Sequence, residues 1–173
     1  MRIGAHKAGS VTTAKDARIT RLGRLLRRCK LDELPQLWNV LIGEMSFVGP
    51  RPDVPGYADK LQGDDREFLE LLPGITGPAT LLFREEENLL AMASDPLRFN
   101  DDVIYPEKIR INKEYLANGT VWGDIGYIIV TLLPSVTKRI GLDRQLGLDH
   151  EAFHERMMQA LVAEQYGKTP PPQ

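Results

Sequence analysis

The distribution of hydrophobic and polar positions predicts a succession of amphipathic helices with a few short strands. Apolar residues recur at spacings of three and four along much of the chain, which is the period of a helix with one buried side. The segments with this pattern are residues 18–30, 32–43, 57–72, 85–93, 108–117, 122–136 and 150–165. Residues 45–48 and 80–83 are short and apolar and are predicted to be strands. The expected fold is therefore a mostly helical α+β domain.

Segments without this periodicity mark the ends and the loops of the domain. Residues 1–17 are predicted to form a flexible basic segment, and residues 168–173 a disordered tail. Residues 73–78 and 94–106 each contain two prolines and are predicted loops. The remaining body, residues 18–167, is long enough to form a single domain with a core.

Several side chains are predicted to face inward from the helical pattern. In the helices at residues 32–43, 57–72 and 150–165 they are Leu34, Leu37, Trp38, Leu41, Ile42, Tyr57, Leu61, Phe68, Leu72, Phe153, Met157 and Leu161. The helix at residues 122–136 is apolar over most of its surface. It is expected either in the core or at a membrane interface, where Trp122 would suit the depth of the lipid headgroups.

Charge is distributed unevenly along the chain. Residues 1–30 carry nine Lys or Arg residues and one acid, whereas the formal net charge of the whole chain is −2. A basic segment beside an acidic body indicates an anionic partner, such as nucleic acid, anionic lipid or a nucleotide diphosphate. The helix at residues 18–30 has its arginines mostly off its apolar stripe. It is expected either to lie on an anionic membrane surface or to pack on its own domain.

Composition excludes or disfavours several classes of protein. No aromatic residues interleave with the basic residues, so nucleic acid is not the expected partner. Cys29 is the single cysteine, which excludes an internal disulfide and fits a reducing cytoplasm. The sequence has no run of about eighteen apolar residues and no signal peptide pattern.

The candidate chemistry is concentrated in residues 30–52. Asp32 and Glu33 stand at the start of a predicted helix, directly after the basic segment, and Pro35 fits the first turn. A helix N-terminus is a natural site for phosphate, and an ionised Asp beside a bound phosphate can act as a nucleophile when a cation reduces the repulsion. The alternative is that the two acids only cap the helix. The same segment ends in Pro50-Arg51-Pro52, a rigid mount for a guanidinium.

This segment, KLDELPQLWNVLIGEMSFVGPRP, resembles the signature of the bacterial sugar transferase family, the monotopic phosphoglycosyl transferases. A second block, Pro-Gly-Ile-Thr-Gly at residues 73–77, matches the family and precedes Arg84 at the family's spacing. Tyr115 and Asp124 fall where the family has a tyrosine and then an aspartate before its last helix. The resemblance covers about residues 11 to 137. It departs from the family at residues 79–83, after Pro78, where many members carry a more polar run.

The resemblance implies a reaction and assigns roles to particular residues. A sugar 1-phosphate would pass from a UDP-sugar to polyprenyl (undecaprenyl) phosphate, with release of UMP and an aspartyl-phosphosugar intermediate. Asp32 would be the nucleophile, and Glu33 would support it or help to hold Mg²⁺ with it. The predicted substrate contacts are Arg51, Arg84, Pro50, Pro52, Gly74, Thr76 and Gly77. For Arg84 the alternative is an ion pair with the acids at residues 85–87, and for the two glycines it is a tight turn.

The resemblance also implies where the protein works. Family members start the assembly of exopolysaccharide, capsule, O-antigen or other glycans on the cytoplasmic face of the bacterial inner membrane. Their full-length forms begin with a hydrophobic re-entrant membrane helix, and this chain is expected to begin just after that part. We therefore expect a peripheral or monotopic domain whose basic helix at residues 18–30 contacts the anionic surface. On its own, this chain is expected to be soluble.

The sequence also permits two alternatives to the transferase. The first is a truncated, inactive relative that acts as a membrane-surface or anion-binding module. The second is a zinc hydrolase, because His150, Glu151 and His154 match H-E-x-x-H. A catalytic zinc needs a third protein ligand. His6 is the one other histidine, and the downstream acids do not have the expected spacing, so zinc hydrolysis is disfavoured.

Overall fold

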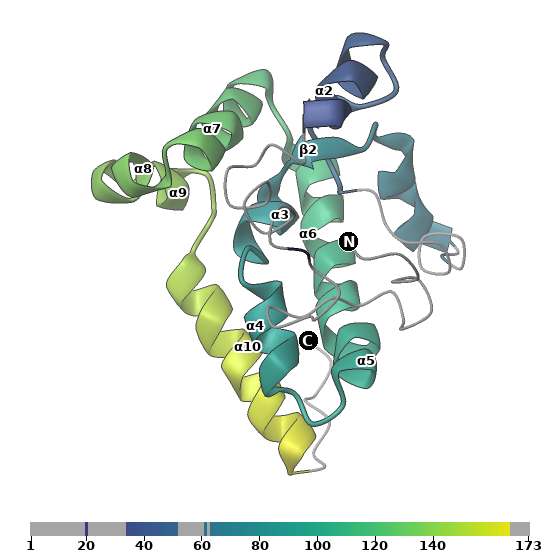
Figure 1. Cartoon of the computed structure of the whole chain (residues 1–173), viewed down its shortest axis with the longest axis vertical. Helices are drawn as coiled ribbons and strands as arrows, with labels where there is room; N and C mark the ends of the chain where they lie inside the picture. Colours follow the sequence, from purple (N-terminus) through teal and green to yellow (C-terminus); the bar gives the residue numbers. More distant parts are fainter. Residues whose placement is uncertain (1–19, 21–33, 52–60, 62, 167–173) are drawn as a thin grey trace.

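The computed structural model describes residues 20, 34–51, 61 and 63–166. The predicted segments at residues 1–17, 18–30 and 168–173 lie outside these residues almost entirely. The described part confirms the expected fold class, a mostly helical α+β domain. Figure 1 shows α6 running through the middle of the molecule, with α7, α8 and α9 gathered at one side and α10 beside α4.

The sheet of the described part has two parallel strands. Strand β1 spans Ser46–Val48 and β2 spans Gly74–Thr76, with Ser46 opposite Gly74 and Val48 opposite Thr76. The prediction of a strand at residues 45–48 is confirmed. The prediction of a loop at residues 73–78 is wrong, because this glycine-rich segment pairs with a strand that lies far from it in the sequence. The composition of residues 73–78 alone could not predict a pairing with so distant a segment.

Helices make up most of the rest of the described chain. Their bounds are α2 Leu34–Leu41, η4 Gly63–Glu70 (a 3₁₀ helix), α3 Pro78–Leu82, α4 Glu86–Met92, α5 Pro96–Phe99, η5 Asn100–Ile104 (a π-helix), α6 Tyr105–Asn118, α7 Val121–Leu132, α8 Pro134–Ile140, α9 Leu142–Gln145 and α10 His150–Gln165. The predicted helices at residues 85–93, 108–117 and 150–165 are confirmed.

Three further predictions of secondary structure are wrong, each for a local reason. Residues 80–83 belong mostly to α3 rather than to a strand, and Pro78 opens that helix at its first position. Residues 96–106 are helical rather than a loop, because the Asp95 carboxylate caps α5 by accepting from the N–H groups of Leu97 and Arg98. The helix predicted at residues 122–136 is divided into α7 and α8 at Pro134, which has no N–H to continue the first helix.

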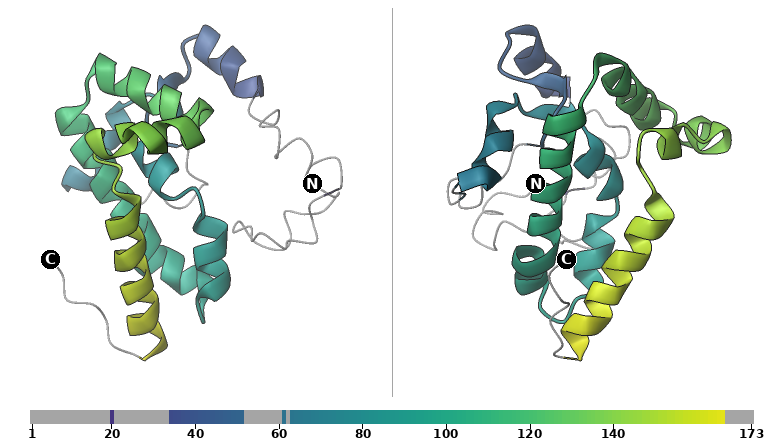
Figure 2. Two further views of the ribbon diagram at one scale, coloured as in Figure 1. Left: turned by 90° about the vertical axis from the view of Figure 1, so that its left-hand side faces the viewer. Right: turned by 180° about the vertical axis from the view of Figure 1, so that it is seen from behind.

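The main core lies between α10 and the helices α3 to α6. Phe83 and Phe153 meet edge to face, with ring centroids 4.8 Å apart, and the ammonium of Lys108 lies 5.4 Å from the Phe83 ring centroid. Phe153, Met157 and Leu161 are buried in this cluster, which confirms their predicted inward side. The two views of Figure 2 show α10 as a long helix at the edge of the body it helps to cover.

Two apolar surfaces are left exposed in the described structure. The predicted burial of the α2 side is wrong, since Trp38 is 63% and Leu41 76% exposed. The prediction that Leu72 faces inward is also wrong. Helix α7 buries Gly126 and Val130 but leaves Trp122, in its first turn, exposed. No helix in the described ranges has the length and apolarity needed to cross a bilayer.

Candidate functional site

The predicted catalytic pair lies outside the described residues. Asp32 and Glu33 directly precede α2, which begins at Leu34, and Pro52 also falls in an undescribed range. The structure describes the other predicted site residues. Gly74 and Thr76 lie in β2, Pro50, Arg51 and Gly77 lie just after the strands, and Arg84 lies on the turn between α3 and α4. The roles of Asp32 and Glu33 stay predictions.

The two strands join the two motif blocks of the sequence, residues 30–52 and residues 73–77. The N–H of Gly74 donates to the carbonyl oxygen of Pro50 at 2.8 Å, and the N–H of Gly49 donates to that of Thr76 at 2.9 Å. Pro50 is buried, while Arg51, the next residue, is exposed. The Pro-Gly-Ile-Thr-Gly block thus supports the backbone that leads into the exposed Arg51.

Close backbone approach explains why glycine stands at Gly74 and Gly77. A Cβ atom on Gly77 would lie 2.5 Å from the carbonyl oxygen of Gly49, and one on Gly74 would lie 2.7 Å from the Gly49 Cα. Real Cβ atoms do not come so near to backbone atoms, so any side chain would force the two segments apart. The glycines therefore have a packing role between the strands, and contact with a substrate stays a prediction for both.

Thr76 connects the sheet to α7. Its hydroxyl lies 2.7 Å from the Thr131 hydroxyl, which itself donates to the carbonyl oxygen of Tyr127 at 2.7 Å. A hydroxyl has a single proton, so Thr76 is the donor to Thr131. Thr76 is buried. Its side chain is directed towards α7, and a role in substrate binding stays a prediction.

Tyr115 and Asp124 are brought together at the corner between α6 and α7. The phenol oxygen donates to Oδ1 of Asp124 at 2.6 Å. Burial, followed by this hydrogen bond and the charge of Asp124, raises the pKa of Tyr115 above its ordinary value. The phenol therefore keeps its proton and holds the carboxylate in the first turn of α7. The Tyr127 ring packs against Tyr115 with centroids 6.1 Å apart.

Arg84 lies on the turn between α3 and α4, where its side chain is exposed. It makes no ion pair with the acids at residues 85–87 in the described structure, and Glu86 pairs with Lys108 at 2.7 Å instead. Arg84 acts electrostatically on His150, the first residue of α10. Burial, aided by Arg84 and Lys138 and opposed by Asp143, lowers the pKa of His150.

A cavity of about 440 Å³ lies beside the Tyr115–Asp124 corner. It is formed where α6 and α7 meet the segment between α9 and α10. Its walls include Tyr115 and Arg110 from α6 and Tyr127 from α7. Leu146, between α9 and α10, and Arg156, from α10, also line it. Arg110 pairs with Glu107 at 2.9 Å and with Glu114 at 3.1 Å. The sequence carries no signal for this cavity, because the walls come from segments that are distant along the chain.

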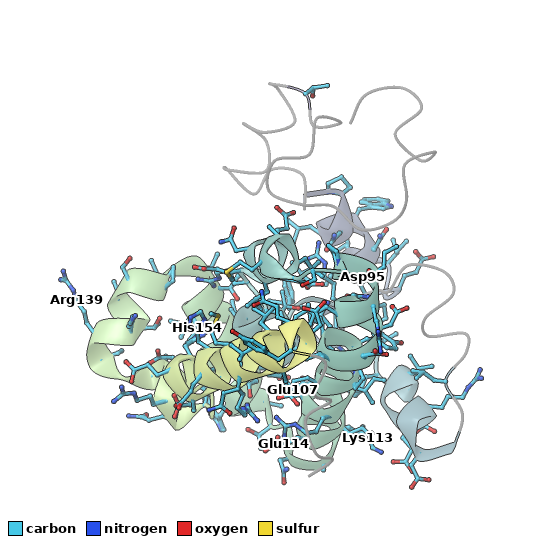
Figure 3. The ribbon with its side chains drawn as sticks, turned by 90° about the horizontal axis from the view of Figure 1, so that it is seen from below. Asp95, Glu107, Lys113, Glu114, Arg139 and His154 are labelled. Carbon is cyan, nitrogen blue, oxygen red and sulfur yellow. The ribbon has the colours of Figure 1, made fainter. Side chains whose placement is uncertain are left out.

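The H-E-x-x-H residues lie at the start of α10, and His154 is labelled in Figure 3. Its surroundings do not supply a metal site. No three His, Cys, Asp or Glu side chains of the described ranges are grouped closely enough to hold a metal ion.

Comparison with known proteins matches the family indicated by the motifs. A family model for the bacterial sugar transferases matches residues 1–138. The chain is 36% identical over 117 residues to a UDP-galactose-lipid carrier transferase of Erwinia amylovora, covering 68% of this chain and 21% of the relative. It is 36% identical over 138 residues to an undecaprenyl-phosphate glucose phosphotransferase of Komagataeibacter xylinus, covering 76% and 24%.

A third relative is more similar over a shorter stretch. It is a putative undecaprenyl-phosphate N-acetylgalactosaminyl 1-phosphate transferase of Bacillus subtilis, 48% identical over 73 residues, which cover 42% of this chain and 41% of the relative. The alignments with these three relatives therefore span from 21% to 41% of the relatives' own lengths. The sugar in the names differs from one relative to the next.

Proposed function

Because the chain belongs to the bacterial sugar transferase family, we propose that it forms the catalytic part of a phosphoglycosyl transferase. It would move a sugar 1-phosphate from a UDP-sugar to undecaprenyl phosphate, and so start the assembly of a cell-surface glycan. The structural observation that supports this proposal is the pairing of β1 with β2. That pairing places Arg51 beside the second family block, a short helix away from Asp32 in the sequence.

The proposed reaction has two displacements at one phosphorus atom. An oxygen of Asp32 attacks the β-phosphorus of the UDP-sugar, the bond to the bridging oxygen breaks, and UMP leaves with the electron pair. A phosphate oxygen of the lipid then attacks the same phosphorus, and the bond to Asp32 breaks to restore the carboxylate. A covalent intermediate divides one difficult transfer into two easier ones.

Charge neutralisation is the main task of the remaining residues. Phosphoryl transfer needs positioning and positive charge around the phosphate oxygens. Arg51 and Arg84 are both exposed, and a guanidinium can bind two phosphate oxygens at once. We assign them to the diphosphate or to the lipid phosphate. The adjoining Pro50 is fixed by its bond to Gly74, which lowers the entropy lost when Arg51 binds.

Asp32 and Glu33 would also hold a divalent cation. Carboxylate oxygens are the ligands that Mg²⁺ prefers, so this donor set fits that ion. When bound, Mg²⁺ supplies positive charge that reduces the repulsion between the diphosphate and the attacking carboxylate.

The lipid acceptor requires that the enzyme work at a membrane surface, and the structure offers a suitable face. Helices α7 and α8 expose Val121, Trp122, Ile125, Leu132, Leu133, Val136 and Ile140. The last turn of α8 carries Lys138 and Arg139, and Figure 3 shows Arg139 projecting away from the body. We propose that this face and the basic helix predicted at residues 18–30 rest together on the anionic cytoplasmic leaflet.

The test is release of UMP from a panel of UDP-sugars, with Mg²⁺, undecaprenyl phosphate and detergent. The chain would be compared with Asp32→Asn and with Asp64→Asn, a matched change at an exposed acid of η4. Release that needs the lipid and Asp32 but not Asp64 would support the proposal and name the sugar. No release with any sugar, from a folded chain that still binds anionic vesicles, would favour the inactive membrane-surface module instead.

A further inference from the structure

Helix α7 carries two hydrogen-bonded contacts with residues of the family-matched region. Asp124, in its first turn, accepts the hydrogen bond of Tyr115 at 2.6 Å. Thr131, near its end, accepts that of Thr76 at 2.7 Å. A rotation or shift of α7 would therefore move both contacts at the same time.

One residue outside α7 packs against the middle of that helix. Leu146 lies in the segment between α9 and α10, and its side chain occupies the space beside Gly126. A Cβ atom on Gly126 would come within 2.8 Å and 2.9 Å of the two terminal methyl carbons of Leu146. The next residue of α7, Tyr127, donates from its phenol to the carbonyl oxygen of Leu146 at 3.3 Å. Two consecutive residues of α7 thus contact the side chain and the backbone of the same residue.

The segment between α9 and α10, which contains Leu146, is held in place by the burial of Leu148. Leu148 is 1% exposed and packs with Leu81 and Val130 in a cluster separate from the main core, and Leu146 packs against that cluster. Val130 belongs to α7 itself. The segment of Leu146 and Leu148 therefore contacts α7 at Gly126, Tyr127 and Val130. This segment follows residue 138, where the family match ends.

We propose that Leu146 is a positioning residue, which sets the rotation of α7 and through it the placement of Asp124 and Thr131. The proposal rests on the proposed function for its kinetic consequence, because the site that α7 positions is the transferase site. Its structural half, the control of α7 by Leu146, stands on the contacts above. The segment after the family-matched residues is then part of the catalytic unit rather than an appendage.

The experiment is a size exchange at the contact. Gly126→Ala adds a methyl group against the terminal carbons of Leu146. Because Leu146 is itself packed against the buried cluster of Leu81, Val130 and Leu148, we expect α7 to shift rather than Leu146 alone. We then expect kcat for UMP release to fall about tenfold or more with a smaller change in KM, since small misplacements of reacting groups are costly. Leu146→Ala in the same chain removes the collision. The double variant should recover to within about threefold of the wild-type kcat, a partial rescue of the kind that coupled sites show.

Met157→Ala is the stability control, because Met157 lies in the main core away from α7. It should lower the melting temperature while leaving kcat unchanged at temperatures well below melting. A Gly126→Ala loss no larger than that of Met157→Ala at matched stability would overturn the proposal, and so would a double variant that fails to recover.

A second measurement needs no transferase activity, so the failure of the proposed function can be told apart from the failure of this inference. In protein with ¹³C-labelled tyrosine, the signals of Tyr115 and Tyr127 should move in Gly126→Ala, return in the double variant and stay in place in Met157→Ala. Unmoved tyrosine signals in Gly126→Ala would refute the control of α7 by Leu146, whether or not the wild-type chain releases UMP.

Discussion

Tyr115 donates its phenol proton to the carboxylate of Asp124 across 2.6 Å, and this bond closes the corner between α6 and α7. The two residues are nine positions apart, one in the last turns of the first helix and the other in the first turn of the second. The bond orients one carboxylate oxygen and fixes the angle at which α7 leaves α6. The corner also forms one wall of the cavity described above.

Stability should fall at alkaline pH because of this corner. The pKa of Tyr115 is raised in the folded state by burial and by Asp124, whereas the pKa of a tyrosine in the unfolded chain is about 10. The stabilisation is therefore fully present below about pH 10 and is lost as pH rises from there through the higher folded pKa. Urea unfolding between pH 8 and pH 11 should show a steeper alkaline loss for the wild type than for Tyr115→Phe. The matched control is Tyr166→Phe, at an exposed tyrosine, which should keep the wild-type slope.

Gly74→Ala should disrupt the strand pair. The new Cβ would meet the N, Cα and O atoms of Gly49, and backbone atoms cannot move aside as a flexible side chain can. We expect a loss of about 3 kcal/mol in the free energy of unfolding, the upper end for overpacking. Gly123→Ala is the control, because its Cβ would meet only the Thr120 hydroxyl at 3.2 Å. Equal stability of the two variants in urea would contradict the close approach of β1 and β2.

Thr131→Val should separate the sheet from α7. It removes the hydroxyl that links Thr76 to the carbonyl of Tyr127, and leaves the buried Thr76 hydroxyl without its acceptor, at a cost of about 1–3 kcal/mol. UMP release should fall as well. In Thr137→Val, the matched change, the lost bonds run only to carbonyls one turn back, at Leu133 and Pro134. That variant should lose stability without losing transfer, and a similar loss of transfer in both would argue against the Thr76–Thr131 link.

Arg84→Ala should weaken the use of the UDP-sugar without unfolding the domain. Arg84 is exposed, and the loss of one charge-assisted contact to phosphate is expected to lower kcat/KM about tenfold or more. Arg98→Ala removes an arginine of a surface ion pair with Asp102 at 3.2 Å and serves as the control. Steady-state kinetics that do not distinguish Arg84→Ala from Arg98→Ala would remove Arg84 from the proposed site. Arg51→Ala would be measured in the same series.

Trp122→Ala should reduce binding to anionic lipid vesicles. Trp122 is 81% exposed on the α7–α8 face, and tryptophan is well suited to the depth of the lipid headgroups. We expect about a tenfold weaker partition coefficient in vesicle sedimentation, which corresponds to about 1.4 kcal/mol. Tyr166→Ala, an exposed aromatic just after α10, should bind as the wild type does. If Trp122→Ala binds equally well, this face does not rest on the membrane.

Periodicity made most of the helices predictable, since the spacing of apolar residues is a property of the chain itself. The helix at residues 150–165 and its inward Phe153, Met157 and Leu161 are confirmed in α10. The spacing of apolar residues could not show whether another segment packs on the apolar side of a helix. The sides of α2 and α7 have the pattern of buried helices, yet Trp38 and Trp122 are exposed in the described structure.

The candidate site divides in the same way. The two family blocks, with Arg51 and Arg84, could be found in the sequence because short motifs keep their order and spacing. The contacts of Thr76 with Thr131 and of Gly126 with Leu146 could not, because they join residues 55 and 20 positions apart. A local sequence pattern gives no information on contacts between residues so far apart in the chain.

The sequence by itself determined the family, the helical segments and the residue types available for phosphate chemistry, because these depend on composition and on spacing along the chain. Only the tertiary structure decided that the glycine-rich block at residues 73–77 pairs as a strand with β1 and that α7 is held between Thr76 and Leu146. Those arrangements depend on which backbones can approach and which side chains fill the space between them, and both are settled only when distant segments pack.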